Sequence, residues 1–452
     1  MRFLGVDLGT TSLSAAMIDL ETGKVLATRN RAHHAEVAPD APGAHAQDPD
    51  ALVAGARALI ELCQTEFGDL AGIGVTGQMH GILYIDAGGR AVSPLYTWLD
   101  RQAERLAEGG KAYLELFAEL TGEAVPLGYG AVTHFTQHRQ GRIPDAAVSF
   151  CTAADYLVMR LAGLAQPLID PTLAHSLGLF ELEQNTFGAS WTALGDRVRL
   201  PTLVTQGAVA GRLENTPVVT ALADNQASFI GSVGESRRSV LVTLGTSGQV
   251  TCLGDAKPDS SPELELRPFP GGGYLFTGAS LTGGKAFEVL TGLIDSVALR
   301  LTGERASDPY ALLGGPDTVG PPYLRVDTRF AGSRGGAKSG GIHGITLANL
   351  TLEHLAYGFA QGVVDELYAF WTGAFTRAGV TAQITELVGS GNAVRQSRLV
   401  RERLGETFGL PLRLTQHAEE AAVGAALYAA AVVSDRPLGE VAQSVLRAGL
   451  LG

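Results

Sequence analysis

Hydrophobic residues near the start of the chain fall into two short runs on either side of a small polar turn. One run ends at Asp7, the next follows Ser14, and Gly-Thr-Thr-Ser lies between them at 9–12. Two apolar runs around such residues predict a β-hairpin. A turn of glycine and small hydroxyls exposes backbone N–H groups, so a phosphate chain can approach it closely.

Asp7 lies one strand position before this turn. A carboxylate repels bare phosphate, so its place beside a phosphate site makes sense with a hydrated divalent cation between them. The alternative is a plain surface hairpin, in which Asp7 and Thr10 make only local turn hydrogen bonds. The first hairpin alone leaves both interpretations open.

A second copy of the pattern favours the phosphate site. Residues 240–251 repeat the order of apolar strand, Leu-Gly-Thr, small hydroxyl and strand, with Gly245 and Thr246 in the turn. Aligning Thr10 with Thr246 places the copies 236 residues apart, about half the chain. Two related domains, each with a phosphate turn, are the natural explanation.

Between the two hairpins, the pattern alternates between helices and buried strands. Asp48-Pro49 predicts the start of a helix that ends near Phe67. The apolar strand at 73–76 then leads into Gln78, Met79 and His80. Ligands of open α/β sheets gather at the carboxyl ends of strands, so this loop is a candidate substrate site. The alternative for His80 is an ordinary core or hinge histidine.

Three further stretches carry candidate chemistry. Trp98 and Asp100 bring an aromatic ring and a carboxylate close together in the chain, and the alternative to a binding role is a packed tryptophan beside an exposed ion pair. Asp224 follows an apolar strand at the predicted first turn of a helix, where free N–H groups favour an ionised carboxylate. The alternative for Asp224 is an ordinary N-cap residue.

Glycine-rich segments of the second half are further candidates for ligand contact. Gly283 and Gly284 open a helix, and Gly391 and Asn392 follow an apolar strand, so the backbone could approach a ligand at both places. The alternative for Gly283 and Gly284 is an ordinary loop. A lone Gly-x-Gly is weak evidence, but here it follows two phosphate turns. The small-residue helix that begins at Glu419 is interpreted as structural.

Composition narrows the function further. The chain has 452 residues, which indicates two or more domains, and 45% hydrophobic residues, enough for a sizeable core. A net charge of −12 argues against nucleic acid or an anionic membrane as partner. The apolar run 421–433 is too short to span a bilayer, and Asp7 comes too early for a secretory signal. Three scattered cysteines suggest neither disulfides nor zinc, so we expect a cytoplasmic protein.

Taken together, these motifs resemble the actin-like ATPase superfold, and within it the FGGY carbohydrate kinases. The segment Gly77-Gln78-Met79-His80-Gly81 is similar to that of the ketose kinases of the family. The resemblance implies an α/β fold of two actin-like (ribonuclease H-like) ATPase domains flanking a central cleft. Residues 1–235 would form an N-terminal sugar-binding domain, and 236–452 a C-terminal nucleotide-binding domain.

The resemblance also implies roles for the candidate residues. Asp224 would be the catalytic base and would contact the substrate, although Ala223 replaces the usual glycine before it. Asp7 would bind Mg²⁺. The sugar would contact Gln78, Met79, His80, Trp98, Asp100 and Asp224. ATP would contact Thr10, Thr11, Ser12, Gly245, Thr246, Gly283, Gly284, Gly391 and Asn392. The segment 128–139 departs from the family pattern, so no contact is carried over there.

The implied activity is the ATP-dependent phosphorylation of a primary hydroxyl of a ketose. We favour sedoheptulose, giving sedoheptulose 7-phosphate, because the chain is short and because 128–133 and 389–393 look more like sedoheptulokinases than xylulokinases. Xylulose, giving xylulose 5-phosphate, is the alternative. An actin-like ATPase or sensor without a sugar substrate is a more distant one. A homodimer stays open alongside a monomer.

Overall fold

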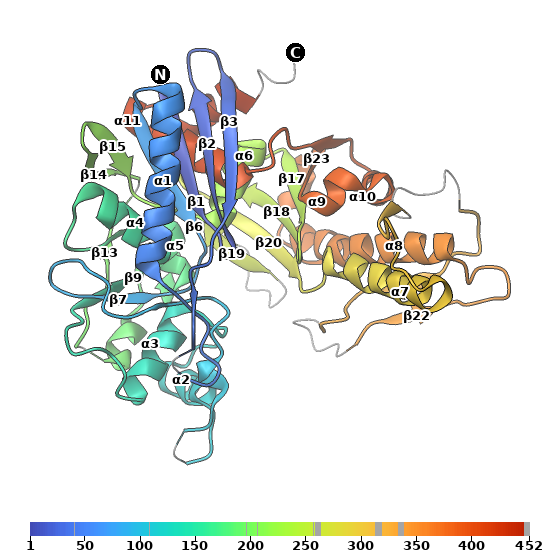
Figure 1. The fold of residues 1–452 in the computed structure, drawn as a ribbon, viewed down its shortest axis with the longest axis horizontal. Helices are drawn as coiled ribbons and strands as arrows, with labels where there is room; N and C mark the ends of the chain where they lie inside the picture. The colour runs from blue at the N-terminus through green and yellow to red at the C-terminus, as the bar shows by residue number, and fades with distance from the viewer. Residues whose placement is uncertain are drawn as a thin grey trace. The chain divides into compact units, whose positions relative to one another are not determined.

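A computed structural model describes residues 1–39, 41–107, 109–195, 197–205, 207–255, 257, 264–311, 319–332 and 339–446. The chain divides into two compact units (Figure 1). The first comprises 1–235, 268–272 and the described part of 419–452, and the second comprises 236–267 and 273–418. Residues 268–272 and the described part of 419–452 lie in the first unit, although 236–452 was expected to form the second domain.

The first unit is built on one mixed sheet. Its strands are β1 (Arg2–Leu8), β2 (Ser12–Asp19), β3 (Lys24–Ala32), β6 (Gly72–Gly77), β14 (Val209–Leu213), β15 (Thr216–Val219) and β16 (Leu222–Ala223). They run in the order β14-β15-β6-β1-β2-β3, and β16 also pairs with β6. The β1–β2 pair is antiparallel, with Asp7 opposite Ser14, which confirms the predicted hairpin.

The second unit repeats this plan. Its sheet contains β17 (Ser239–Leu244), β18 (Gly248–Gly254), β19 (Glu265–Pro268), β20 (Tyr274–Ser280), β23 (Glu386–Ser390) and β24 (Leu412–Leu414). The order is β19-β20-β18-β17-β23-β24. The hairpin β17–β18 is antiparallel and β23 is parallel to β17, as β6 is to β1. The internal repeat is confirmed, and Thr243 stands where the first hairpin has Asp7.

Helices cover the sheets of both units. Those of the first unit are α1 (Pro49–Phe67), α2 (Tyr113–Thr121), α3 (Gly130–Arg139), α4 (Ala153–Ala162), α5 (Pro171–Ser176), α6 (Asp224–Val233), α11 (Glu420–Ser434) and α12 (Leu438–Leu446). Those of the second are α7 (Lys285–Thr302), α8 (Leu352–Phe370), α9 (Asn392–Gln396) and α10 (Arg398–Phe408). The carboxylate of Asp48 accepts the N–H groups of Asp50 and Ala51, which confirms the predicted cap of α1.

Helix α11 joins the first unit because its small residues let it approach the central strands closely (Figure 1). A Cβ on Gly5 of β1 would lie 1.8 Å from the carbonyl oxygen of Ala422. A Cβ on Gly74 of β6 would lie 2.0 Å from that of Ala425. Backbone contact of this kind requires glycine on the strand and small residues on the helix, so the last segment packs on the first sheet.

Several short strands of the first unit pair outside its main sheet. They are β4 (Glu36–Val37), β5 (Ala46–Gln47), β7 (Leu83–Ile85), β8 (Leu95–Tyr96), β9 (Ser149–Cys151), β10 (Leu168–Ile169), β11 (Phe180–Glu181), β12 (Thr186–Phe187) and β13 (Thr202–Leu203). A further pair in the second unit is β21 (Arg325–Asp327) with β22 (Gly341–His343). Each unit has its own hydrophobic core, around Tyr84 and Phe150 in the first and Phe276 and Phe375 in the second.

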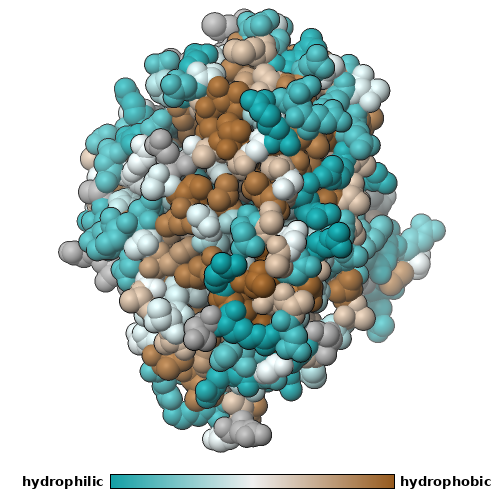
Figure 2. All heavy atoms as spheres, turned by 90° about the vertical axis from the view of Figure 1, so that its left-hand side faces the viewer, coloured by the Kyte–Doolittle hydropathy of each residue, from teal (hydrophilic) through white to brown (hydrophobic). Residues whose placement is uncertain are grey.

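The surface is mixed in character. Figure 2 shows hydrophobic residues in patches that hydrophilic residues separate, on the face that the first unit presents. The three cysteines, Cys63, Cys151 and Cys252, are buried and form no disulfide. In the part of the chain that the structure describes, no helix is long and apolar enough to cross a membrane.

Candidate active site

Three neighbouring strands of the first unit deliver the candidate residues to one edge of the sheet. Strand β1 runs parallel to β6, with Asp7 opposite Thr76, and β16 runs parallel to β6, with Leu222 opposite Thr76. The Thr76 hydroxyl donates to the carbonyl oxygen of Leu222 at 2.7 Å. Asp7, the loop after β6 and Asp224 therefore meet at the carboxyl ends of adjacent strands, where ligands of such sheets bind.

Asp7 is half-buried, and one oxygen of its carboxylate is fully enclosed. This Oδ1 atom has no hydrogen-bond partner among the described residues. Burial, together with the negative charges of Asp224 and Glu419, raises the pKa of Asp7 to about 7. A bound cation would reduce the repulsion among these negative charges and would give the enclosed oxygen a partner.

Glu419 is a neighbour of Asp7 that sequence reasoning missed. The Ser14 hydroxyl donates to Glu419 Oε2 at 2.5 Å, and the Asn30 side-chain amide donates to both carboxylate oxygens at 3.2 and 3.3 Å. Ser14 stands opposite Asp7 on the paired strand. Glu419, at the start of α11, therefore adds negative charge near Asp7. The sequence had suggested only a structural role for this helix.

This donor set fits a hydrated Mg²⁺ ion. Among the described residues, no group of three or more His, Cys, Asp or Glu side chains is arranged as a metal cage. Mg²⁺ does not need one, because it keeps several waters and is held through one or two carboxylates and substrate phosphates. The unpartnered oxygen of Asp7 is suited to such a role.

Asp224 is the first residue of α6, directly after β16. The N-cap position belongs to Ala223, so Asp224 is not the ordinary N-cap of the alternative interpretation. The Ala223 N–H donates to the Thr172 hydroxyl at 3.2 Å, and Asp170 in turn holds Thr172. The strand-to-helix turn is therefore fixed, with the carboxylate in the first turn, where the helix dipole favours negative charge.

The loop after β6 holds its histidine in a strained conformation. His80 has a φ of +74°, which is unusual for a residue other than glycine. Its N–H donates to the Ser176 hydroxyl at 3.2 Å, and Nδ1 lies 2.7 Å from the Ser176 carbonyl oxygen. The ring stacks on Tyr129, with centroids 3.9 Å apart. Tyr129 and Ser176 are thus further residues of the site, and Tyr129 comes from the segment that departs from the family pattern.

Trp98 and Asp100 have different surroundings. Trp98 is 45% exposed, and its indole N–H donates to the Thr10 hydroxyl at 2.9 Å. Asp100 is 3% exposed, and its oxygens accept the N–H of His45, the N–H of Gln102 and the Gln102 side-chain amide. Trp98 thus presents a face beside the phosphate turn, whereas Asp100 organises the loop around it through protein donors.

In the second unit, glycines bring the turn between β17 and β18 against the start of α7. A Cβ on Gly283 would lie 2.2 Å from the Ser247 carbonyl carbon, and one on Gly284 would lie 2.4 Å from the Gly245 carbonyl oxygen. The Gly284 N–H donates to that oxygen at 2.7 Å. These glycines are required for backbone-to-backbone packing, in addition to any approach of a ligand. Gly391, with a φ of +87°, similarly approaches the backbone of Leu244.

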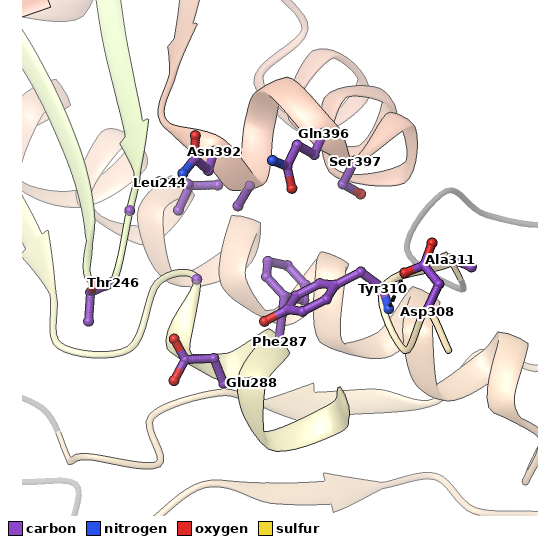
Figure 3. A pocket seen from close by; sticks show the side chains of 13 residues that line it. Leu244, Thr246, Phe287, Glu288, Asp308, Tyr310, Ala311, Asn392, Gln396 and Ser397 are labelled. Atoms are coloured by element: carbon purple, nitrogen blue, oxygen red, sulfur yellow. Dashed lines mark hydrogen bonds between the residues drawn. The ribbon is translucent and has the colours of Figure 1, made fainter. Parts of the chain in front are cut away.

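A pocket of about 640 Å³ lies beside these glycines, within the second unit (Figure 3). Its lining is Leu244, Gly245, Thr246, Gly284, Phe287, Glu288, Asp308, Tyr310, Ala311, Asn392, Ala393, Gln396 and Ser397. Four of the lining residues are ones that the sequence predicts to contact ATP: Gly245, Thr246, Gly284 and Asn392. Gly283 and Gly391, which carry the same prediction, do not line the pocket. Figure 3 shows Asn392 and Gln396 across the pocket from Phe287 and Tyr310. Its size and mixture of apolar and polar groups suit a nucleoside.

The aromatic and acidic lining of this pocket could not be located from the sequence. Phe287 and Glu288 lie inside an ordinary helix pattern, and Asp308 and Tyr310 lie in a loop with no motif. Only the fold places them opposite α9.

Comparison with known proteins agrees with this geometry. Residues 2–231, half of the chain, match the FGGY family of carbohydrate kinases, N-terminal domain. The chain is 28% identical to the sedoheptulokinase of Mus musculus, over 94% of this chain and 96% of that protein. It is 25% identical to the xylulose kinase of Escherichia coli, over 91% of this chain and 85% of that protein.

A solved structure, the xylulose kinase from Rhodospirillum rubrum, superposes with a TM-score of 0.81 at 24% identity, over 98% of this chain and 92% of that one. The fold is therefore the actin-like two-domain ATPase fold, as the sequence motifs predicted. A sugar-independent ATPase or sensor is set aside, because the matched family consists of carbohydrate kinases. The chain belongs to the FGGY family of carbohydrate kinases and is an ATP-dependent sugar kinase.

Proposed function

We propose that this kinase transfers the γ-phosphoryl group of ATP to a primary hydroxyl of sedoheptulose, giving sedoheptulose 7-phosphate. The sedoheptulokinase relatives, which match over nearly the whole length of both chains, support this substrate. The observation that carries the reaction is the position of Asp224, at the end of β16 beside the ends of β1 and β6.

Asp224 would act as the general base. Its carboxylate would accept the proton of the sugar hydroxyl as the oxygen of that hydroxyl attacks the γ-phosphorus and the bond to the β-phosphate oxygen breaks. The neighbouring loop would hold the sugar: Gln78, Met79 and His80 would contact its hydroxyls, and the face of Trp98 would cover its C–H groups. Asp100 would keep this loop in place.

The hairpin turn of each unit offers donors suited to phosphate. Thr10, Thr11 and Ser12 offer hydroxyl and backbone donors in the first unit, and Gly245 and Thr246 offer them in the second. Asp7 would hold a hydrated Mg²⁺, which supplies neutralisation of phosphate charge when bound. The adenosine would occupy the pocket lined by Gly284 and Asn392, next to Gly283 and Gly391.

Xylulose is the second candidate substrate. Xylulose kinases are similar to this chain in sequence and in fold, although the Escherichia coli protein is matched over a smaller share of its length than the sedoheptulokinases. The two sugars differ by two carbons, so the depth of the sugar pocket decides between them.

A coupled assay of ADP release tests the proposal. Purified protein with magnesium ATP is given sedoheptulose, xylulose, ribulose, glycerol or no sugar, and Asp224→Asn is measured alongside. We expect one ketose to stimulate ADP release, and the variant to lose on the order of 10²–10⁴-fold in kcat with little change in sugar affinity. Equal ADP release with every sugar, unchanged in Asp224→Asn, would overturn the proposed function.

A further inference from the structure

A buried glutamine connects the substrate loop to the phosphate turn. Gln47, in β5, is completely buried, although no sequence motif singled it out. Its side-chain Nε2 donates to the Thr10 carbonyl oxygen at 2.7 Å. Its Oε1 accepts from Nε2 of Gln78 at 2.8 Å. One side chain therefore contacts both the first phosphate turn and the residue that opens the substrate loop.

The direction of these hydrogen bonds is fixed by chemistry. The Thr10 carbonyl can only accept, so the NH₂ group of Gln47 must face it. The oxygen of Gln47 then faces Gln78, which must present its own NH₂ group. Gln78 is 4% exposed, and its remaining atom, Oε1, is buried without a donor among the described residues. The series of hydrogen-bonded amides therefore ends at Gln78 Oε1, which can accept a hydrogen bond from a hydroxyl group.

At its other end, this series of hydrogen-bonded amides reaches the Thr10–Thr11 peptide, whose N–H is a proposed donor to phosphate. The peptide group is planar, so the carbonyl of Thr10 and the N–H of Thr11 belong to one rigid unit. Holding the carbonyl through Gln47 therefore sets the direction of the Thr11 N–H. The Thr10 side chain is held separately, by the indole of Trp98 at 2.9 Å. Trp98 is itself a proposed sugar-binding residue, and Gln47 contacts another, Gln78.

We propose that Gln47 is a positioning residue that couples sugar binding at Gln78 to the geometry of the phosphate turn at Thr10. This inference rests on the proposed ketose kinase activity. A sugar hydroxyl that donates to Gln78 Oε1 fixes the Gln78 amide, which fixes Gln47 and through it the Thr10–Thr11 peptide. The turn then binds the nucleotide phosphates more tightly when sugar is present, and sugar more tightly when nucleotide is present.

Two substitutions of Gln47 distinguish its hydrogen bond to Thr10 from its hydrogen bond to Gln78. Gln47→Leu removes both hydrogen bonds. Gln47→Glu keeps an acceptor for Gln78 but has no donor for the Thr10 carbonyl when ionised. The control is Gln137→Leu, which replaces another completely buried glutamine of the first unit, on α3, whose side-chain amide has no hydrogen-bond partner within the described residues.

Calorimetric titration measures the coupling directly. The dissociation constant of a non-hydrolysable ATP analogue with magnesium is determined with and without the ketose that stimulates ADP release. In wild-type protein and in Gln137→Leu we expect the ketose to tighten nucleotide binding on the order of 10-fold. In Gln47→Leu and Gln47→Glu this ratio should fall to about 1, and Gln47→Glu should keep its affinity for the sugar alone.

A measurement on wild-type protein covers the case in which a variant fails to fold. Sugar alone should slow hydrogen exchange of the backbone amides in the turn 9–12, as read by mass spectrometry. Unchanged hydrogen exchange in this turn, or an unchanged affinity ratio in both Gln47 variants, overturns the inference about Gln47. The proposed function still holds in that case if a ketose stimulates ADP release. Absence of any sugar response in the wild-type protein overturns the proposed function and this inference together.

Discussion

The indole N–H of Trp98 donates to the hydroxyl oxygen of Thr10 at 2.9 Å. The two residues are 88 positions apart in the chain. The hydrogen bond links the aromatic residue proposed to cover the sugar with the turn proposed to hold phosphate. An exposed tryptophan in this position thus has a polar role in addition to its apolar face.

Trp98→Phe keeps the aromatic face and removes the donor. A hydrogen bond of this kind contributes about 0.5–1.5 kcal/mol, so we expect nucleotide affinity to fall about 2–10-fold while sugar affinity changes less. Titration calorimetry with each ligand separately measures this. Trp191→Phe is the control, because that buried indole donates to the Gly178 carbonyl and should affect stability only. A larger loss of sugar affinity than of nucleotide affinity would contradict the role given to the indole N–H.

Asp7→Asn should separate stability from activity. The substitution removes a buried charge whose pKa burial and the charges of Asp224 and Glu419 raise to about 7. Without metal at pH 8, we expect the variant to be more stable by on the order of 2 kcal/mol, and ketose phosphorylation to fall on the order of 100-fold or more. Urea unfolding with EDTA and the coupled assay measure the two effects.

Asp19→Asn, at the far end of the same hairpin, provides a control of opposite sign. The Asp19 carboxylate accepts hydrogen bonds from the Met1 ammonium group and the Glu21 N–H. Its loss should therefore destabilise the protein. A destabilised Asp7→Asn would show that this carboxylate has partners that stabilise its charge.

Ala393→Leu tests the pocket of the second unit. Ala393 lines the pocket opposite Gly284, so a larger side chain occupies space that the nucleoside would need. We expect nucleotide affinity to fall on the order of 10-fold, with sugar affinity unchanged. Ala378→Leu is the matched control, since Ala378 lines a separate, smaller hollow of the same unit. Equal nucleotide binding by the two variants would place the nucleoside elsewhere.

Stability should fall in mild acid because of His134. Burial, together with the charge of His138, lowers the pKa of this histidine to about 4. The unfolded chain takes up the proton near pH 6.5, so the folded state loses stability as pH falls from 6.5 to 4, by about 3 kcal/mol in total. His134→Gln keeps an acceptor for the Tyr84 hydroxyl without a titrating group.

Urea unfolding at pH 7.5 and pH 5 compares this variant with wild-type protein and with the exposed neighbour variant His138→Gln. The pH dependence should be weaker in His134→Gln and unchanged or nearly so in His138→Gln. An equal loss of stability in all three proteins would assign the acid sensitivity to other groups.

The sequence by itself determined the parts of this protein that depend on short-range pattern. The hairpin around residues 9–12, its repeat at Gly245, the cap of α1 and the strand-to-helix turn before Asp224 are all specified by neighbouring residues. Alternating strands, turns and caps leave a signal within a few positions, so the fold and the main motif residues could be predicted.

Only the tertiary structure decided which distant residues complete the site. Glu419 reaches Ser14 across 405 positions, Gln47 connects Thr10 with Gln78, and Tyr129 stacks on His80. The return of α11 to the first sheet depends on glycines of β1 and β6. Such contacts leave no local pattern, because each partner's own neighbourhood is satisfied by an ordinary helix, strand or loop. Packing of the whole chain was needed to bring them together.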